Sequence, residues 1–319
     1  SGTFTLHNEG TVFNSGIFQT QGSVSMIVRN GSNFNAPFKV NTGTATSYDD
    51  GSPFVANYKG TITVDAGAIL TTLNVGYSNR AYGNVTNNGT IVGDRFIMRG
   101  NFLTNAAGAN ISPSNLDFDS TTSIFGSGTF TGNLIAINST GNVSLGNNVT
   151  FSPSSNFTVT NGGILNPNTR TFTINSSTFY AHTGSSILNS GNFRTQGTVN
   201  MIIRNGSNFN APLNVNTGTT FSYDDGSPFV ANYFNTITID ANATLSVQAG
   251  GYTIQANNNV TNNGTINGSG SSFNMTGNSF ANNGFVTPTT FNFNDTTSIS
   301  ENGTWNPNNL NINGNSIVR

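Results

Sequence analysis

The phrase YDDGSPFVANY occurs twice in the chain, at residues 48–58 and 223–233, and its residue types are the ones most able to carry chemistry. Each copy contains two adjacent aspartates and is followed by a third: Asp49, Asp50 and Asp65 in the first copy, and Asp224, Asp225 and Asp240 in the second. Two or three carboxylates on neighbouring turns of a repetitive fold can act as acid and base on a glycosidic bond or as ligands for Ca²⁺. The phrase therefore marks the candidate functional site.

A surface turn is the competing interpretation, because Asp-Asp-Gly-Ser-Pro is ordinary turn sequence. The only cation near the phrase that is kept in both copies is an arginine, Arg29 or Arg204, and an enzyme seldom needs two copies of its site in one chain. We expect a structural turn first, a loop that binds glycan or Ca²⁺ second and catalysis last, with no catalytic residue and no metal site assigned. The candidate ligand-binding residues are Tyr48, Asp49, Asp50, Tyr58, Tyr223, Asp224, Asp225 and Tyr233.

Two other residue patterns could serve binding. Three tyrosines recur at the same spacing: Tyr48, Tyr58 and Tyr77 in the first copy, and Tyr223, Tyr233 and Tyr252 in the second. Exposed tyrosines can stack on sugar rings, but in an alternating run they are usually half-buried with a wet hydroxyl. Thr-x-Thr pairs are also frequent, as in ice-binding solenoids, but their spacing is irregular, whereas an ice-binding array needs the same position on every coil. Ice binding is therefore disfavoured.

The charge balance excludes several classes of protein. Only 7% of the residues are charged, and 10 Lys and Arg face 12 Asp and Glu, so no basic field exists for nucleic acid or for an anionic membrane. No apolar run is long enough for a membrane-spanning helix. The chain has no cysteine and 2 histidines, which leaves no thiolate site and too few histidines for a three-His metal site. We expect no cofactor.

An internal repeat with an offset of 175 residues organises the chain. Residues 14–58 match residues 189–233 at 36 of 45 positions, and the same offset pairs His7 with His182 and NVTNNGTI at 84 with NVTNNGTI at 259. The sequence predicts a first repeat over 1–175 and a truncated second repeat over 176–319, in one continuous solenoid.

Short alternating runs such as TITV at 61, TFTI at 171 and TITI at 236 place β-branched or aromatic side chains on one face and Thr or Asn on the other. They are separated by NNG, NGS and DDG, which are turn sequences, and no stretch has helical apolar spacing. The chain is predicted to be all-β.

A parallel β-solenoid is the architecture that this pattern favours, with coils on the order of 20 to 25 residues. Stacked Asn side chains can hydrogen-bond from coil to coil at about 4.8 Å, and the 25 phenylalanines would fill a narrow interior. Tandem β-sandwich domains would also give a long repeat, but no linker is visible. The fold expected is a parallel β-solenoid with a 175-residue super-repeat.

The phrases NNGTI, NSGxF and NGSG resemble the Asn/Gly/Thr-rich β-solenoid repeats of large bacterial surface exoproteins, of the filamentous-haemagglutinin and adhesin kind. The resemblance implies an extracellular, cell-surface fibre or stalk with a scaffolding or adhesive role.

The function expected is structural, with no enzymatic activity. Neither SGTFTL at the start nor LNINGNSIVR at the finish looks like a polar cap, so we expect the coil edges to be covered head to tail by the same protein, as a homopolymer. The alternative is an adhesin stalk that binds glycan or Ca²⁺ through the duplicated phrase. A polysaccharide-degrading enzyme is the third class, and it requires Asp49, Asp50 and Asp65 to converge in one groove. Nucleic acid and a transmembrane segment are not expected.

Overall fold

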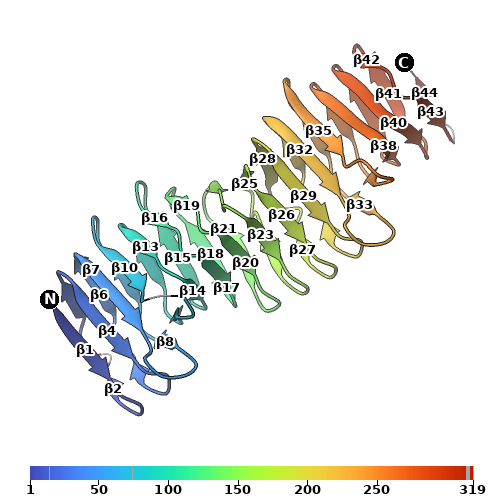
Figure 1. Ribbon diagram of the computed structural model, residues 1–319. Helices are drawn as coiled ribbons and strands as arrows, with labels where there is room; N and C mark the ends of the chain where they lie inside the picture. Colours follow the sequence, from blue (N-terminus) through green and yellow to red (C-terminus); the bar gives the residue numbers. More distant parts are fainter. Residues whose placement is uncertain (14, 74, 314–316, 319) are drawn as a thin grey trace. The chain divides into compact units, whose positions relative to one another are not determined.

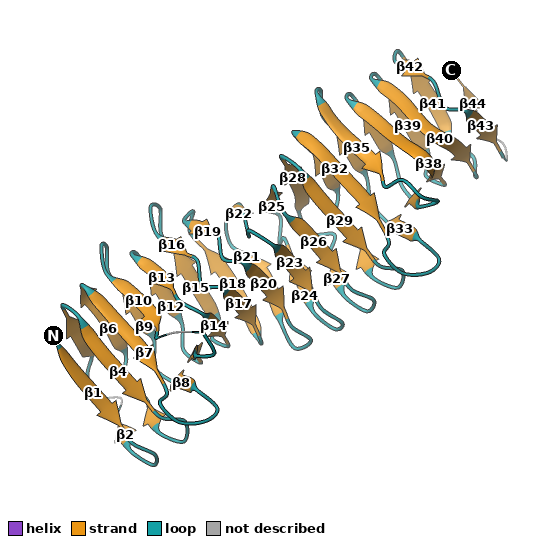
Figure 2. Ribbon diagram, viewed as in Figure 1, coloured by secondary structure: helices purple, strands orange, loops and turns teal. Residues whose placement is uncertain are grey.

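The computed structural model describes residues 1–13, 15–73, 75–313 and 317–318, and in this part of the chain every regular element is a β-strand (Figure 2). The described residues contain no helix, hence none that could cross a membrane. The chain divides into two compact units, Ser1–Ser155 and Asn156–Arg319. Each unit is a parallel β-solenoid in which strands of successive coils lie side by side (Figure 1).

Three parallel sheets form the sides of the first unit, and each coil contributes one strand to each sheet. The first sheet contains β1 (Gly2–Leu6), β4 (Val24–Val28), β7 (Thr44–Tyr48), β10 (Ile69–Thr72), β13 (Thr90–Val92), β16 (Asn110–Ile111), β19 (Thr129–Phe130) and β22 (Val149–Phe151). The second contains β2 (Thr11–Val12), β5 (Asn33–Phe34), β8 (Val55–Tyr58), β11 (Ser78–Ala81), β14 (Arg95–Met98), β17 (Asn115–Phe118) and β20 (Leu134–Ile137). The third contains β3 (Phe18–Gln21), β6 (Phe38–Thr42), β9 (Ile62–Val64), β12 (Val85–Asn87), β15 (Phe102–Asn105), β18 (Thr121–Phe125) and β21 (Asn142–Leu145).

The second unit begins with the same arrangement and then changes it. One sheet contains β25 (Thr171–Asn175), β28 (Asn192–Gln196), β31 (Leu213–Val215), β34 (Ile237–Ile239), β37 (Val260–Asn262), β39 (Ser279–Asn282), β41 (Ser298–Glu301) and β44 (Ile317–Val318). A second contains β23 (Asn156–Val159), β26 (Thr178–Ala181), β29 (Val199–Ile203), β32 (Gly218–Tyr223), β35 (Ala243–Val247), β38 (Thr265–Met275), β40 (Phe285–Phe293) and β42 (Thr304–Trp305). The remaining strands are β24 (Ile164–Asn166), β27 (Ser186–Ile187), β30 (Asn208–Phe209), β33 (Val230–Tyr233), β36 (Thr253–Ala256) and β43 (Asn309–Ile312). The long strand β38 pairs with both β35 and β36, and its register shifts between Gly268 and Ser272.

Coil length varies, and the strand registers measure it. Gly2 lies opposite Val24, which is 22 residues later, Thr44 lies opposite Ile69 at 25, and Asn110 lies opposite Thr129 at 19. These spacings agree with the coil length expected from the sequence. The prediction of an all-β parallel solenoid is confirmed.

The interior of each unit is built from every second side chain of the strands, as period-2 alternation requires. Phenylalanines stack along it. In the second unit Phe193 lies 4.6 Å from Phe179 and 5.1 Å from Phe209, measured between ring centroids, and all three rings are fully buried. The phenylalanines therefore form the core that the sequence analysis expected.

Buried asparagines form a second kind of stack at the turns. Asn87 donates through Nδ2 to Oδ1 of Asn105 at 2.8 Å, and Asn262 donates in the same way to Asn282 at 2.8 Å. All four side chains are fully buried. Asparagine ladders between coils thus occur inside the turns of both units.

Candidate binding loops

The two copies of YDDGSPF form loops that project beyond the neighbouring turns, between β7 and β8 and between β32 and β33 (Figure 1). Each loop follows a strand whose last residue is a tyrosine, Tyr48 or Tyr223. Each loop ends at a phenylalanine with a left-handed backbone, φ 61° at Phe54 and φ 62° at Phe229. A positive φ is a steric outlier for a bulky residue, so the surrounding contacts must hold this conformation.

The first aspartate of each loop is buried and serves as a backbone acceptor. Asp49 accepts from the amide N of Asn30 and from the amide N of Gly51, both at 2.9 Å. Asp224 accepts from the corresponding amides of Asn205 and Gly226 at 3.0 and 2.9 Å. Both carboxylates are 1% exposed. Their role is to fasten the loop to the preceding coil, which corrects the expectation that they contact a ligand at the surface.

The second aspartate of each loop forms a forked ion pair with the recurring arginine. In the first unit Arg29 donates through Nε to Asp50 Oδ1 at 2.6 Å and through Nη2 to Oδ2 at 2.9 Å. The third guanidinium nitrogen, Nη1, lies 3.0 Å from Nδ1 of His7, which can accept a hydrogen bond when the ring is neutral. We call these three residues the Arg-Asp-His latch.

The latch recurs in the second unit with the same distances. Arg204 donates to Asp225 at 2.6 and 2.9 Å and lies 3.0 Å from Nδ1 of His182. The guanidinium of Arg204 also lies 6.0 Å from the centre of the Tyr180 ring, where the first copy has Thr5. The sequence analysis paired the histidines through their common offset but did not connect them to the arginines.

Acid is expected to open the latch. The hydrogen bonds from Arg29 and Arg204 hold the pKa values of Asp50 and Asp225 below the ordinary aspartate value of about 3.9. The latch contribution to stability is therefore complete above about pH 3.9 and is lost as the pH falls through the folded-state pKa. Carboxyl-carbon NMR titration should give midpoints below 3.9, and Arg29→Gln with Arg204→Gln should return them to the ordinary value. Midpoints at or above 3.9 in the wild-type protein would contradict the latch.

Tyr58 and Tyr233 belong to the core and do not reach the surface. They are 0% and 1% exposed, and each hydroxyl is hydrogen-bonded to a buried serine, Ser47 or Ser222. Burial raises the pKa of both phenols. The expectation of ligand contact for these two tyrosines is therefore corrected: they are inward members of the alternating strands β8 and β33.

The other recurring tyrosines gather around the projecting loops. Tyr48 and Phe54 both contact Tyr77, with ring centroids 5.9 and 5.3 Å apart and steep interplanar angles. Tyr223 and Phe229 contact Tyr252 in the same way, both at 5.5 Å. The sequence analysis noted the recurring tyrosines but missed the phenylalanines, although Phe54 and Phe229 stood inside the duplicated phrase.

The third aspartate of each copy lies elsewhere on the coil. Asp65 follows β9 in the third sheet and pairs with Lys39, with 2.9 Å between Nζ and Oδ2. Asp240 follows β34 and accepts from the side-chain amides of Asn214 and Asn216 at 3.1 and 2.8 Å. The convergence that a polysaccharide-degrading enzyme requires is not found. Among the described residues, no three His, Asp or Glu side chains gather as metal ligands would.

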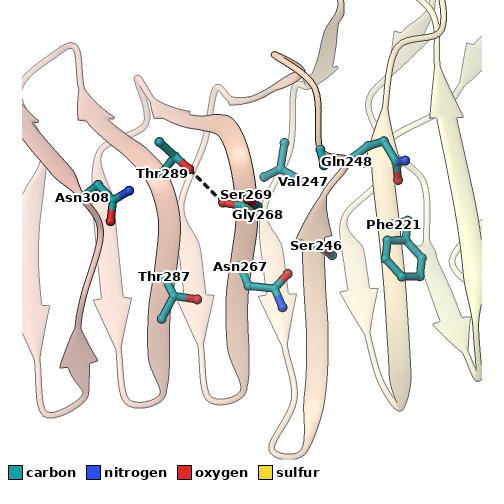
Figure 3. Close-up of a pocket in the computed structure, with 11 residues that line it drawn as sticks. Phe221, Ser246, Val247, Gln248, Asn267, Gly268, Ser269, Thr287, Thr289 and Asn308 are labelled. Carbon is teal, nitrogen blue, oxygen red and sulfur yellow. Dashed lines mark hydrogen bonds between the residues drawn. The ribbon is translucent and has the colours of Figure 1, made fainter.

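An open groove of about 580 Å³ lies on the second unit, over β32, β35, β38 and β40 (Figure 3). Asn267 lies between Ser246 and Thr287 of the adjacent coils, and Thr289 donates to the carbonyl of Gly268 at 3.4 Å. The side chains that line the groove are neutral. The groove thus offers hydrogen bonds but no general acid or base.

No protein-family model, no curated protein and no solved structure matches this chain.

Proposed function

We propose that this protein is an extracellular structural protein that belongs to a cell-surface filament and extends by head-to-tail stacking of solenoid coils. The observation that supports it best is the ladder of neutral amides between coils. In the second unit Asn311 donates to Asn292 at 2.7 Å, and Asn292 donates to Asn274 at 2.7 Å. Such a ladder repeats by translation, so a further coil meets the same partners as the last one.

The few charges of the chain fit the same scaffold. In a stack of coils an outward side chain lies about 4.8 Å from its counterpart on the next coil, where like charges repel. Five ion pairs join the described residues, and each links side chains 20 to 26 positions apart, which is about one coil. Charges are thus accepted where the adjacent coil supplies the opposite sign.

The proposal includes the 175-residue super-repeat, with residues 1–175 and 176–319 as two copies within one continuous solenoid. The recurrence of the Arg-Asp-His latch and of the buried aspartates at this offset supports it. The resemblance of NNGTI and NSGxF to repeats of bacterial surface exoproteins supports the extracellular location. Labelling of intact source cells with an antibody to this chain tests the location, and signal only after permeabilisation would contradict it.

Head-to-tail stacking is expected to be blocked by proline at Thr5. Gly2 N and Leu6 O bond to the next coil, so alternation turns the N–H of Thr5 to the opposite edge of β1, where the sheet of described strands begins. Proline removes this N–H without breaking a bond to β4 and is accepted on edge strands. By electron microscopy and light scattering, wild type and Thr5→Val should form filaments while Thr5→Pro should not. Monodisperse wild-type monomers at high concentration would contradict the proposal.

An adhesin stalk is the second candidate function, in which the duplicated loops bind glycan or Ca²⁺. The observation that favours it is the projection of both loops with an aromatic side chain at the surface: Phe54 is 41% and Phe229 is 46% exposed. A scaffold alone does not need these rings.

A further inference from the structure

We propose that the exposed aromatic residues of the two loops are carbohydrate-binding platforms on which a pyranose ring stacks; the proposal rests on the second candidate function. The aromatic platform of the first unit is Tyr48, Phe54 and Tyr77, and that of the second unit is Tyr223, Phe229 and Tyr252. A sugar ring presents an apolar C–H face to an aromatic ring and hydroxyls at its rim, so it needs an aromatic surface beside polar groups.

The packing of each platform presents one ring to solvent on a supporting base. Tyr77 is contacted edge-on by Tyr48 and by Phe54, at interplanar angles of 85° and 62°. Tyr48 and Tyr77 are half-buried, while Phe54 is exposed. Phe54 is held in place at a positive φ by its own backbone N–H, which donates to the carbonyl of Gly51 at 2.7 Å. A large apolar ring is therefore displayed at a fixed position rather than folded into the core.

The divergence between the two copies points to the same set of residues. Beyond the closely matched segment, LNVGYSNR at 73–80 corresponds to QAGGYTIQ at 248–255, and only the Gly-Tyr pair is identical. That retained tyrosine is the base of the platform, Tyr77 or Tyr252. The contact between Phe54 and Tyr77 has thus been kept where the surrounding sequence has not.

The spacing of the rings selects a stacked ligand over a caged cation. In an aromatic cage a cation lies within about 6 Å of each ring centre, which requires a gap between the rings. The rings of both platforms are in direct contact, with centroids 5.3 to 5.9 Å apart, so no ligand fits between them. Only the outer ring face is available.

The size and the polar border of the platform favour a sugar over a protein. Stable protein interfaces take about 800 Å² from each partner, far more than the exposed part of three rings. Beside the first loop lies a recess of about 210 Å³ lined by polar residues that include Asn8, Arg29, Asp50 and Ser52. Arg29 and Asp50 are each about one-third exposed, so the latch offers both donors and acceptors to sugar hydroxyls. Because the latch carries balanced charge, the platform suits an uncharged polysaccharide.

The experiment is a binding screen of the full chain against immobilised uncharged and acidic polysaccharides, followed by calorimetry with oligosaccharides of those that bind, with and without EDTA. Phe54→Ala with Phe229→Ala should weaken binding at least tenfold, and each single variant should halve the number of sites. Phe54→Leu with Phe229→Leu keeps apolar volume without a ring face and should weaken binding equally, so it decides the matter if the alanine variant does not fold. The matched control is Phe102→Ala with Phe285→Ala, which removes one similarly exposed ring from each unit.

Binding of uncharged polysaccharide that is lost in both platform variants and kept in the control supports the proposal. Failure of the wild-type protein to bind any polysaccharide overturns both the platform and the glycan arm of the second candidate function. Binding that is abolished by EDTA but not by the platform variants overturns the platform alone and assigns the loops to Ca²⁺. Binding to acidic polysaccharides only, or equal loss in the control, also overturns the platform.

Discussion

Replacement of Phe193 by alanine is expected to lower the free energy of unfolding by about 3 to 5 kcal/mol. The ring is fully buried and lies between Phe172 at 4.9 Å, Phe179 at 4.6 Å and Phe209 at 5.1 Å. Its removal leaves a cavity that three aromatic neighbours on rigid strands cannot close. Urea unfolding followed by circular dichroism gives the change in free energy.

Phe285→Ala is the matched control, because this phenylalanine of the same unit is 57% exposed. It should change stability by less than about 1 kcal/mol, since surface substitutions away from special features have small effects. Hydrogen exchange should also locate the damage of Phe193→Ala in the coils of β25, β28 and β31, because a coil contacts only its neighbours. A loss below 1 kcal/mol for Phe193→Ala would show that the stacked phenylalanines do not hold the core.

Replacement of Asn87 by leucine is expected to cost about 3 kcal/mol or more. The side-chain amide donates to Oδ1 of Asn105 at 2.8 Å and to the carbonyl of Asn110 at 3.0 Å, and its oxygen accepts from the amide N of Gly89 at 3.2 Å. Leucine leaves three groups unpaired at a buried turn, and each such group costs roughly 1 to 3 kcal/mol. Thermal and urea unfolding of the variant measure the loss.

The adjacent Asn88 supplies the control, because the same substitution there affects an exposed side chain. Asn88→Leu should shift stability by no more than about 0.5 kcal/mol. Equal losses in Asn87→Leu and Asn88→Leu would mean that the turn sequence matters and the ladder does not.

The strands and their inward residues could be read from the sequence because they depend on local patterns. Alternation in TFTI at 171 places Phe172 and Ile174 on one face whatever lies beside the strand, and both are fully buried in β25. The Asn-Asn-Gly phrases predicted turns and an Asn ladder for the same reason, since the turn brings each Asn to the same place on its coil.

The candidate site was only partly predictable. The duplicated phrase located both loops, but alternation could not say that Asp49 turns inward to the amide of Asn30 while Asp50 turns outward to Arg29, because turns lack a fixed period. The same limit hid the exposure of Phe54.

The sequence by itself determined an all-β chain with a polar, weakly charged surface and a duplicated loop, because composition and period 2 act within a few residues. Only the tertiary structure decided which side chains meet across coils: Arg29 with Asp50, 21 positions apart, and Phe54 with Tyr77, 23 positions apart. The physical reason is the coil length. It varies from 19 to 25 residues with each turn and bulge, so the partner of a residue on the next coil is set by the accumulated turn geometry and not by a constant spacing.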